Sequence, residues 1–143
     1  MNLNKENVLI VDDNYDMLEL LQRNLKALNY HTYKASSVVE AINVLEESTI
    51  DLLVTDLQMP GMNGIELLKY AEEHYPTLPK LVITGFPSVT SALDAIKAGA
   101  KDYLAKPFTG EELKNTIHNL LAKTDASKEE KQSSSVAVKS KSQ

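Results

Sequence analysis

The chain has 143 residues, which suits one domain, and its net charge of -5 excludes a broad basic surface for nucleic acid. It contains no cysteine, which excludes disulfides, thiolate catalysis and cysteine-ligated zinc. No apolar run approaches the ~18 residues of a membrane span and the polar amino end is unlike a signal peptide, so we expect a cytoplasmic domain.

Five short apolar runs predict the strands of one sheet. They alternate with helical patterns, and this alternation is typical of βαβ units with parallel strands. Right-handed crossovers would place helices on both faces, so we expect an α/β fold in three layers. In chain order, the runs are Val8–Val11, Thr32–Ala35, Leu52–Thr55, Leu81–Thr84 and Tyr103–Ala105.

Helical signals follow each of these runs. Leucines recur at helical spacing from Leu18 to Leu28, after the first run. Each of the four later helices is predicted to begin at a residue suited to an amino-terminal cap. Two of these caps have a glutamate three residues later, which indicates a capping box. The caps are Ser37 (with Glu40), Asn63, Ser88 and Thr109 (with Glu112).

The composition changes after residue 123. Residues 124–143 are rich in serine and lysine and have too few apolar side chains to bury a core. We therefore expect a folded domain over residues 1–123 and a flexible linker or disordered tail over residues 124–143. An alternative for the first part of this tail is that residues 127–132 extend the last helix.

Charged side chains stand where three of the runs stop. Asp12 and Asp13 follow the first run, Asp56 follows the third, and Lys106 follows the fifth. Ligands of open α/β sheets bind at this carboxyl edge, and in the flavodoxin-like strand order 2-1-3-4-5 the first and third strands are neighbours. Clustered carboxylates repel one another unless a cation is bound, and their oxygens suit Mg2+. The lysine attracts an anion, so the set predicts a site for a metal and a phosphoryl group.

The segments next to these residues add to the prediction. The turn-forming stretch Met59–Gly64 is expected to fix Asp56, whose carboxylate can act as a nucleophile toward phosphorus. Lys106 precedes Pro107, which favours an extended backbone and permits a cis bond. Both features also have structural alternatives. Asp12 and Asp13 would cap the next helix, a role that Asn14 also fits, and Asp56 would cap a turn.

Four segments together resemble the receiver domain of bacterial two-component response regulators, over residues 7–122. Around Thr84 and Tyr103 the sequence is most similar to receivers of nitrogen-regulation-class transcriptional activators. Those proteins usually continue into an ATPase and a DNA-binding domain, and the segment after Lys123 is too short for either. We therefore expect a stand-alone regulator or an excised receiver. The segments are Val11-Asp12-Asp13, Thr55-Asp56-Leu57-Gln58-Met59-Pro60-Gly61, Ile83-Thr84-Gly85 and Tyr103-Leu104-Ala105-Lys106-Pro107-Phe108.

The resemblance implies that Asp56 accepts a phosphoryl group from a sensor histidine kinase or a phosphotransfer protein. It implies direct Mg2+ ligation by Asp13, Asp56 and the backbone carbonyl of Gln58. Asp12 would act through a bound water, and Lys106 would pair with the phosphoryl oxygens. No other cofactor is implied, and the domain would catalyse only its own phosphorylation and dephosphorylation.

The resemblance also implies a switch. The Thr84 hydroxyl would move toward the phosphoryl group, and Tyr103 would turn inward to fill the space behind it. The surface formed by the fourth helix, fifth strand and fifth helix would then change shape and control an output partner or domain, with transcription as one process under control. A homodimer through this surface is a further implied partner. Direct contact of the domain with nucleic acid or a membrane is not expected.

Three other classes compete with this interpretation. A phosphohydrolase of the haloacid-dehalogenase type needs an acid two residues after its nucleophile, where this chain has Gln58. A nucleotide-binding domain would carry G-x-G-x-x-G or G-x-x-x-x-G-K-[ST], and neither motif occurs. A phosphorylation-independent docking module of the same fold usually lacks one of the site residues, and this chain retains them all.

Overall fold

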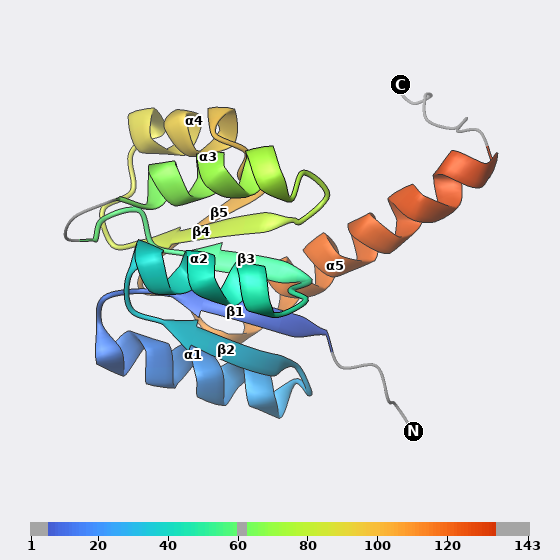
Figure 1. Cartoon of the computed structure of the whole chain (residues 1–143). Coiled ribbons are helices and arrows are strands. Elements are labelled where there is room, and N and C mark those ends of the chain that lie inside the picture. Colours follow the sequence, from blue (N-terminus) through green and yellow to red (C-terminus); the bar gives the residue numbers. More distant parts are fainter. Residues whose placement is uncertain (1–5, 60–62, 134–143) are drawn as a thin grey trace.

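The computed structural model describes residues 6–59 and 63–133. Five parallel strands form one sheet in the order β2-β1-β3-β4-β5, and a helix follows each strand (Figure 1). This confirms the predicted α/β class and the flavodoxin-like strand order. The elements are β1 (Asn7–Val11), α1 (Tyr15–Ala27), β2 (His31–Ala35), α2 (Val38–Glu47), β3 (Leu52–Thr55), α3 (Gly64–His74), β4 (Lys80–Thr84), α4 (Val89–Lys97), β5 (Asp102–Ala105) and α5 (Gly110–Ser133).

Helices cover both faces of the sheet and make it the middle of three layers (Figure 1). On one face, α1 and α5 pack against Val8 and Ile10 of β1. On the other face, α2 and α3 pack against Leu9, while α4 lies beside α3 over Val82 of β4. Every residue of β3 and β4 is buried, which explains why these strands are almost continuous apolar runs in the sequence.

The predicted caps begin their helices, with one difference in detail. Asn63 and Ser88 each accept a hydrogen bond from the backbone N–H three residues later, and Thr109 forms a reciprocal capping box with Glu112. Ser37 also caps its helix, but the Glu40 carboxylate accepts from the Ser36 N–H at 2.7 Å. The predicted box at Ser37 is therefore wrong in its second half, because the glutamate reaches one residue further back.

The helix α5 continues to Ser133, which agrees with the alternative that residues 127–132 extend the last helix. Residues 124–133 of the predicted linker or tail are therefore helical. The remainder of the predicted tail, residues 134–143, lies outside the described part of the chain, and the domain boundary at residue 123 stays a prediction. No helix within residues 6–59 and 63–133 is both long and apolar enough to cross a bilayer.

An ion pair between a buried lysine and a half-exposed glutamate joins α3 to β4 at the end of the sheet away from Asp12 and Asp56. The side chain of Lys80 is fully shielded from solvent, and its Nζ donates to Glu72 Oε1 at 2.8 Å and to the Leu78 carbonyl at 2.7 Å. The Lys80 ammonium holds the pKa of the half-exposed Glu72 carboxyl below its ordinary value. The apolar strand β4 therefore begins with a buried ammonium group, which donates hydrogen bonds to α3 and to the loop before β4.

Candidate functional site

The backbone places Asp12 and Asp56 side by side at the carboxyl edge of the sheet. The Asp12 N–H donates to the Ala35 carbonyl at 3.1 Å, and the Asp56 N–H donates to the Val11 carbonyl at 3.0 Å. Each bond continues a strand pairing by one residue beyond the strand that precedes the aspartate. The sheet itself, rather than a flexible loop, therefore sets the separation of the two carboxylates.

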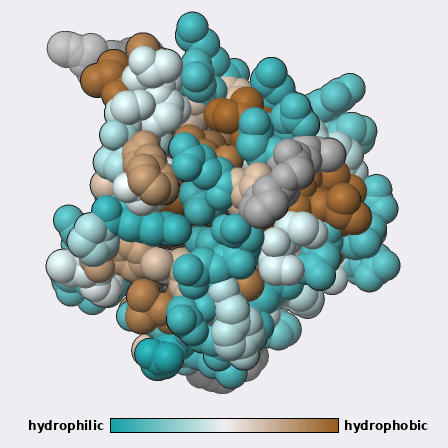
Figure 2. All heavy atoms as spheres, turned by 90° about the vertical axis from the view of Figure 1, so that its left-hand side faces the viewer, coloured by the Kyte–Doolittle hydropathy of each residue, from teal (hydrophilic) through white to brown (hydrophobic). Residues whose placement is uncertain are grey.

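The three acidic side chains gather into one cluster. Asp12, Asp13 and Asp56 each offer a carboxylate oxygen, and these oxygens all lie within 4.8 Å of one another. Asp12 and Asp56 are only 2% and 8% exposed, while Asp13 is exposed. Figure 2 looks onto this edge of the molecule, where hydrophilic side chains predominate between separate hydrophobic patches. A set of carboxylate oxygens open to solvent on one side fits Mg2+, which prefers such ligands and retains several waters.

Lys106 brings an ammonium group to the same cluster. Its Nζ lies 3.0 Å from Asp12 Oδ2 and 3.4 Å from Asp56 Oδ2. Its backbone N–H donates to the Thr84 carbonyl, and the peptide bond to Pro107 is cis. Burial lowers the pKa of Lys106, but the two carboxylates outweigh it, so the pKa lies above its ordinary value. The ammonium therefore stays charged at neutral pH.

Asp56 is held firmly but is only partly neutralised. Its Oδ1 accepts hydrogen bonds from the Leu57 N–H at 2.7 Å and the Gln58 N–H at 3.4 Å. Burial raises the pKa of Asp56, and the nearby Asp12 charge raises it further. Lys106 and the two amides lower the pKa but do not offset these effects, so it lies above its ordinary value. Lys106 is shared and lies closer to Asp12 than to Asp56. A further positive charge near Asp56 would therefore stabilise its ionised carboxylate.

The structure rejects the helix-cap alternative for the aspartate pair. Asn14 caps α1, because its side chain accepts from the Met17 N–H at 2.9 Å. Asp12 supports this turn through Oδ1, which accepts from the Asn14 N–H, while its Oδ2 remains on Lys106. The predicted turn over Met59–Gly64 falls partly on residues 60–62, which lie outside the described residues.

Thr84 and Tyr103 lie on the neighbouring strands β4 and β5. Thr84 is buried, and its hydroxyl accepts from the Phe86 N–H at 3.1 Å. Tyr103 is half-buried, and its hydroxyl forms a hydrogen bond with Ser91 Oγ and accepts from the Ser88 N–H. The phenol therefore contacts the first turn of α4. Sequence reasoning identified Tyr103 but missed Ser91, although two serines three residues apart are the available signal for this cap.

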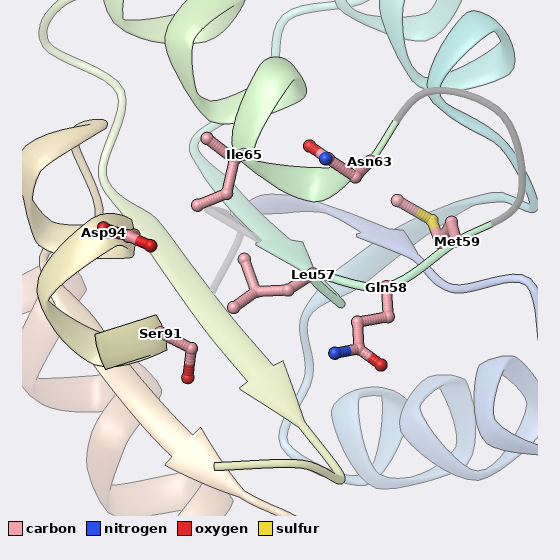
Figure 3. A pocket seen from close by; sticks show the side chains of 7 residues that line it. All are labelled: Leu57, Gln58, Met59, Asn63, Ile65, Ser91 and Asp94. Atoms are coloured by element: carbon pink, nitrogen blue, oxygen red, sulfur yellow. The ribbon is translucent and has the colours of Figure 1, made fainter. Parts of the chain in front are cut away.

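A cavity of about 640 Å³ is lined by Leu57 and Gln58, the two residues that follow Asp56 (Figure 3). It lies between the segment after β3, the first turn of α3 and the helix α4. The side chains of Leu57 and Ile65 extend into its middle, and Ser91 and Asp94 border it from α4 (Figure 3). Gln58 lines the cavity with its side chain while its N–H approaches Asp56, so the residue adjoins both features.

Comparisons with known proteins agree on one family. The family described as "Response regulator receiver domain" matches residues 8–118. The chain is 37% identical over 133 residues to the transcriptional regulatory protein ZraR of Salmonella typhimurium, which covers 93% of this chain and 30% of that protein. The chain therefore spans less than a third of this curated relative's length.

Two solved structures show the same fold over most of the chain. One is a response regulator receiver domain protein (CheY-like) from Methanospirillum hungatei JF-1, with a TM-score of 0.84 and 27% identity over 87% of this chain and 99% of that one. The other is the beryllofluoride-activated NtrC4 receiver domain dimer, with a TM-score of 0.79 and 33% identity over 82% of this chain and 98% of that one.

Proposed function

Because this chain belongs to the response regulator receiver domain family, we propose that it is a phosphorylation-dependent switch whose phosphoacceptor is Asp56. The relationship to ZraR and NtrC4 confirms the resemblance to receivers of the nitrogen-regulation class. The observation that carries the proposal is the cluster of Asp12, Asp13 and Asp56, with the Lys106 ammonium between two of its members. This arrangement provides a nucleophile, a place for a divalent cation and a fixed positive charge.

The proposed donor is a phosphohistidine of a sensor kinase or a phosphotransfer protein. A carboxylate oxygen of Asp56 attacks phosphorus in line, an O–P bond forms, and the P–N bond breaks with its electron pair left on the imidazole. The Leu57 N–H holds one carboxylate oxygen during this step, and the Lys106 ammonium stabilises charge on the phosphoryl oxygens.

The same cluster is proposed to hold Mg2+ through Asp13, Asp56 and the backbone carbonyl of Gln58, with Asp12 acting through a water. When bound, the ion supplies Lewis-acid neutralisation of the phosphoryl oxygens. The donor chemistry supports this assignment, since three carboxylates share one small volume that contains a single ammonium group among the described residues.

The proposal is tested by intact-mass spectrometry of the whole chain after incubation with acetyl phosphate and Mg2+. We expect a mass gain of one PO3 unit, and no gain when the divalent ion is removed with EDTA. An unchanged mass would instead favour a phosphorylation-independent docking module. Sustained hydrolysis of a phosphate monoester would favour a phosphohydrolase.

The surface that is proposed to change on phosphorylation includes α4. Its residues Val89, Leu93 and Ile96 follow one another at helical spacing and are all more than half exposed, and Phe86 before the helix is exposed as well. We propose that this apolar face, together with β5 and α5, binds a second copy of the chain or an output partner. The similar NtrC4 receiver domain forms a dimer when it is activated by beryllofluoride, which supports self-association as one outcome.

Coupling between the site and α4 is proposed to run through Thr84 and Tyr103. The Thr84 hydroxyl donates to the phosphoryl group and no longer accepts from the Phe86 N–H. Tyr103 turns inward and loses its hydrogen bond to Ser91. A full switch needs about 5 kcal/mol of differential stabilisation, which a hydroxyl, an ammonium and a metal acting on one dianion can provide.

Replacing Thr84 with alanine is therefore expected to weaken the coupling. A hydrogen bond to a charged group contributes about 1.5–3 kcal/mol, so the ratio of switched to unswitched chains under beryllofluoride should fall by roughly tenfold or more. The population is measured from backbone amide shifts of α4 and from sedimentation. Thr77→Ala, in the exposed loop before β4, is the matched control. Equal responses of Thr84→Ala and the unmodified chain would contradict the coupling route.

A further inference from the structure

We propose that Gly64, the first residue of α3, is a positioning residue for the phosphoacceptor, an inference that rests on the proposed function of Asp56. Gly64 is buried against the backbone that carries this aspartate. A Cβ atom at Gly64 would overlap the Asp56 carbonyl oxygen and would lie 2.7 Å from Leu57 Cα and 3.0 Å from the Asp56 carbonyl carbon. Since these are backbone atoms, no side-chain rotation relieves the overlap.

The requirement for glycine at this position is one of space. Among the described glycines, only Gly99 has a positive φ, so Gly64 has a backbone conformation open to any residue. The Gly64 N–H donates to the Leu57 carbonyl at 2.8 Å, which draws the start of α3 against the segment after β3. Leu57 and Ile65, from the two segments, line the same cavity (Figure 3). The missing side chain permits this close contact.

The contact bears directly on the orientation of the Asp56 carboxylate. The Asp56 carbonyl and the Leu57 N–H belong to one planar peptide unit, so displacement of the oxygen turns the N–H by the same angle. That N–H donates to Asp56 Oδ1 at 2.7 Å, and the Thr55 hydroxyl donates to the Asp56 carbonyl at 2.8 Å. Gly64 and Thr55 therefore set the plane of one peptide, and this peptide fixes the nucleophile's side chain.

The inference is tested by Gly64→Ala, with Gly99→Ala and Gly110→Ala as matched controls. Gly99→Ala is also strained, because φ is +120° and its Cβ would lie 2.7 Å from Glu72 Oε1. Gly99 lies near the start of β4, away from Asp56, so this variant controls for strain elsewhere in the domain. Gly110 has space for a methyl group. Each variant is measured below its unfolding temperature with acetyl phosphate and saturating Mg2+. We expect the phosphorylation rate to fall by about 10- to 100-fold for Gly64→Ala alone.

A second pair of variants keeps the inference testable if Gly64→Ala does not fold. Thr55→Val removes the hydroxyl that holds the Asp56 carbonyl, and Thr55→Ser retains it. We expect a slower rate for the valine variant and recovery for the serine variant. A wild-type rate in folded Gly64→Ala, or in Thr55→Val, would overturn the inference, as would an equal loss in Gly99→Ala.

A readout independent of phosphorylation separates this inference from the proposed function. The Leu57 amide proton resonance is expected to move upfield in Gly64→Ala and in Thr55→Val, because its bond to the Asp56 carboxylate weakens, and to stay in place in Gly99→Ala. If the wild-type chain accepts no phosphoryl group, the proposed function fails, while this shift still decides whether Gly64 orients Asp56. An unmoved resonance would overturn the inference.

Discussion

Asp56→Asn is expected to abolish the gain of one PO3 unit under conditions in which the unmodified chain is modified. An amide oxygen is a poor nucleophile and bears no charge, so it neither attacks phosphorus nor ligates a divalent ion strongly. Phosphate-affinity electrophoresis after treatment with acetyl phosphate would show one band for this variant and two for the unmodified chain. The effect is a complete loss, because no other carboxylate of the cluster is held by the Leu57 N–H.

The matched control is Asp94→Asn, an exposed aspartate of α4 outside the cluster. This variant should be modified at the rate of the unmodified chain. If Asp56→Asn still gained the mass, another side chain would be the acceptor, and the assignment of Asp56 would be wrong.

The same substitution is expected to stabilise the fold in the absence of divalent ions. The folded-state pKa of Asp56 lies above its ordinary value of 3.8, so its contribution to stability is complete below that value and is lost as the pH rises through the folded pKa. At pH 7 the ionised carboxylate of Asp56 therefore costs stability, and the neutral amide of asparagine avoids this cost. Thermal unfolding in EDTA should show a higher Tm for Asp56→Asn at pH 7, with the difference vanishing toward pH 4.

Lys106→Met is expected to slow phosphorylation by about 10²- to 10³-fold, the loss typical of removing one preorganised charge donor. Methionine keeps most of the length of the side chain but removes the ammonium that lies between Asp12 and Asp56. The carboxylates would then repel each other without compensation, so Mg2+ should bind at least as tightly as before. A fall in rate without a fall in metal affinity, measured by calorimetry, would separate the lysine's role from that of the ion.

Lys101→Met provides the control, since Lys101 is exposed and precedes β5 outside the cluster. It should change neither quantity. If Lys106→Met kept the original rate, the ammonium would have a structural role only, as the partner of Asp12.

The fold was predictable because the strongest signals are local. The strands β3 and β4 are buried on both faces and so appear as apolar runs, and Asn63 and Thr109 cap the helices that they were expected to begin. Clustering of the aspartates followed from the strand order, since neighbouring parallel strands end at the same edge. The reach of Glu40 to Ser36 was not predictable, because it depends on one side-chain rotamer.

Individual side-chain contacts between helices, strands and loops could not be predicted from the sequence. Lys106 was expected to face a phosphoryl group, and its nearest acidic partner in the structure is Asp12, which is distant in sequence. The contact of Tyr103 with Ser91 depends on how α4 is seated, and the close approach of Gly64 to Asp56 depends on how α3 meets the preceding segment. No periodicity in the sequence encodes either contact, whereas the acidic cluster follows directly from strand ends.

The buried position of Lys80 has a practical consequence. Its Nζ is shielded and already donates twice, so amine-reactive reagents should acetylate exposed lysines such as Lys97 and Lys101 long before they reach it. Lys80 becomes accessible only when α3 separates from β4, an opening that approaches global unfolding. The acetylation rate of Lys80 would therefore report how often the native domain opens.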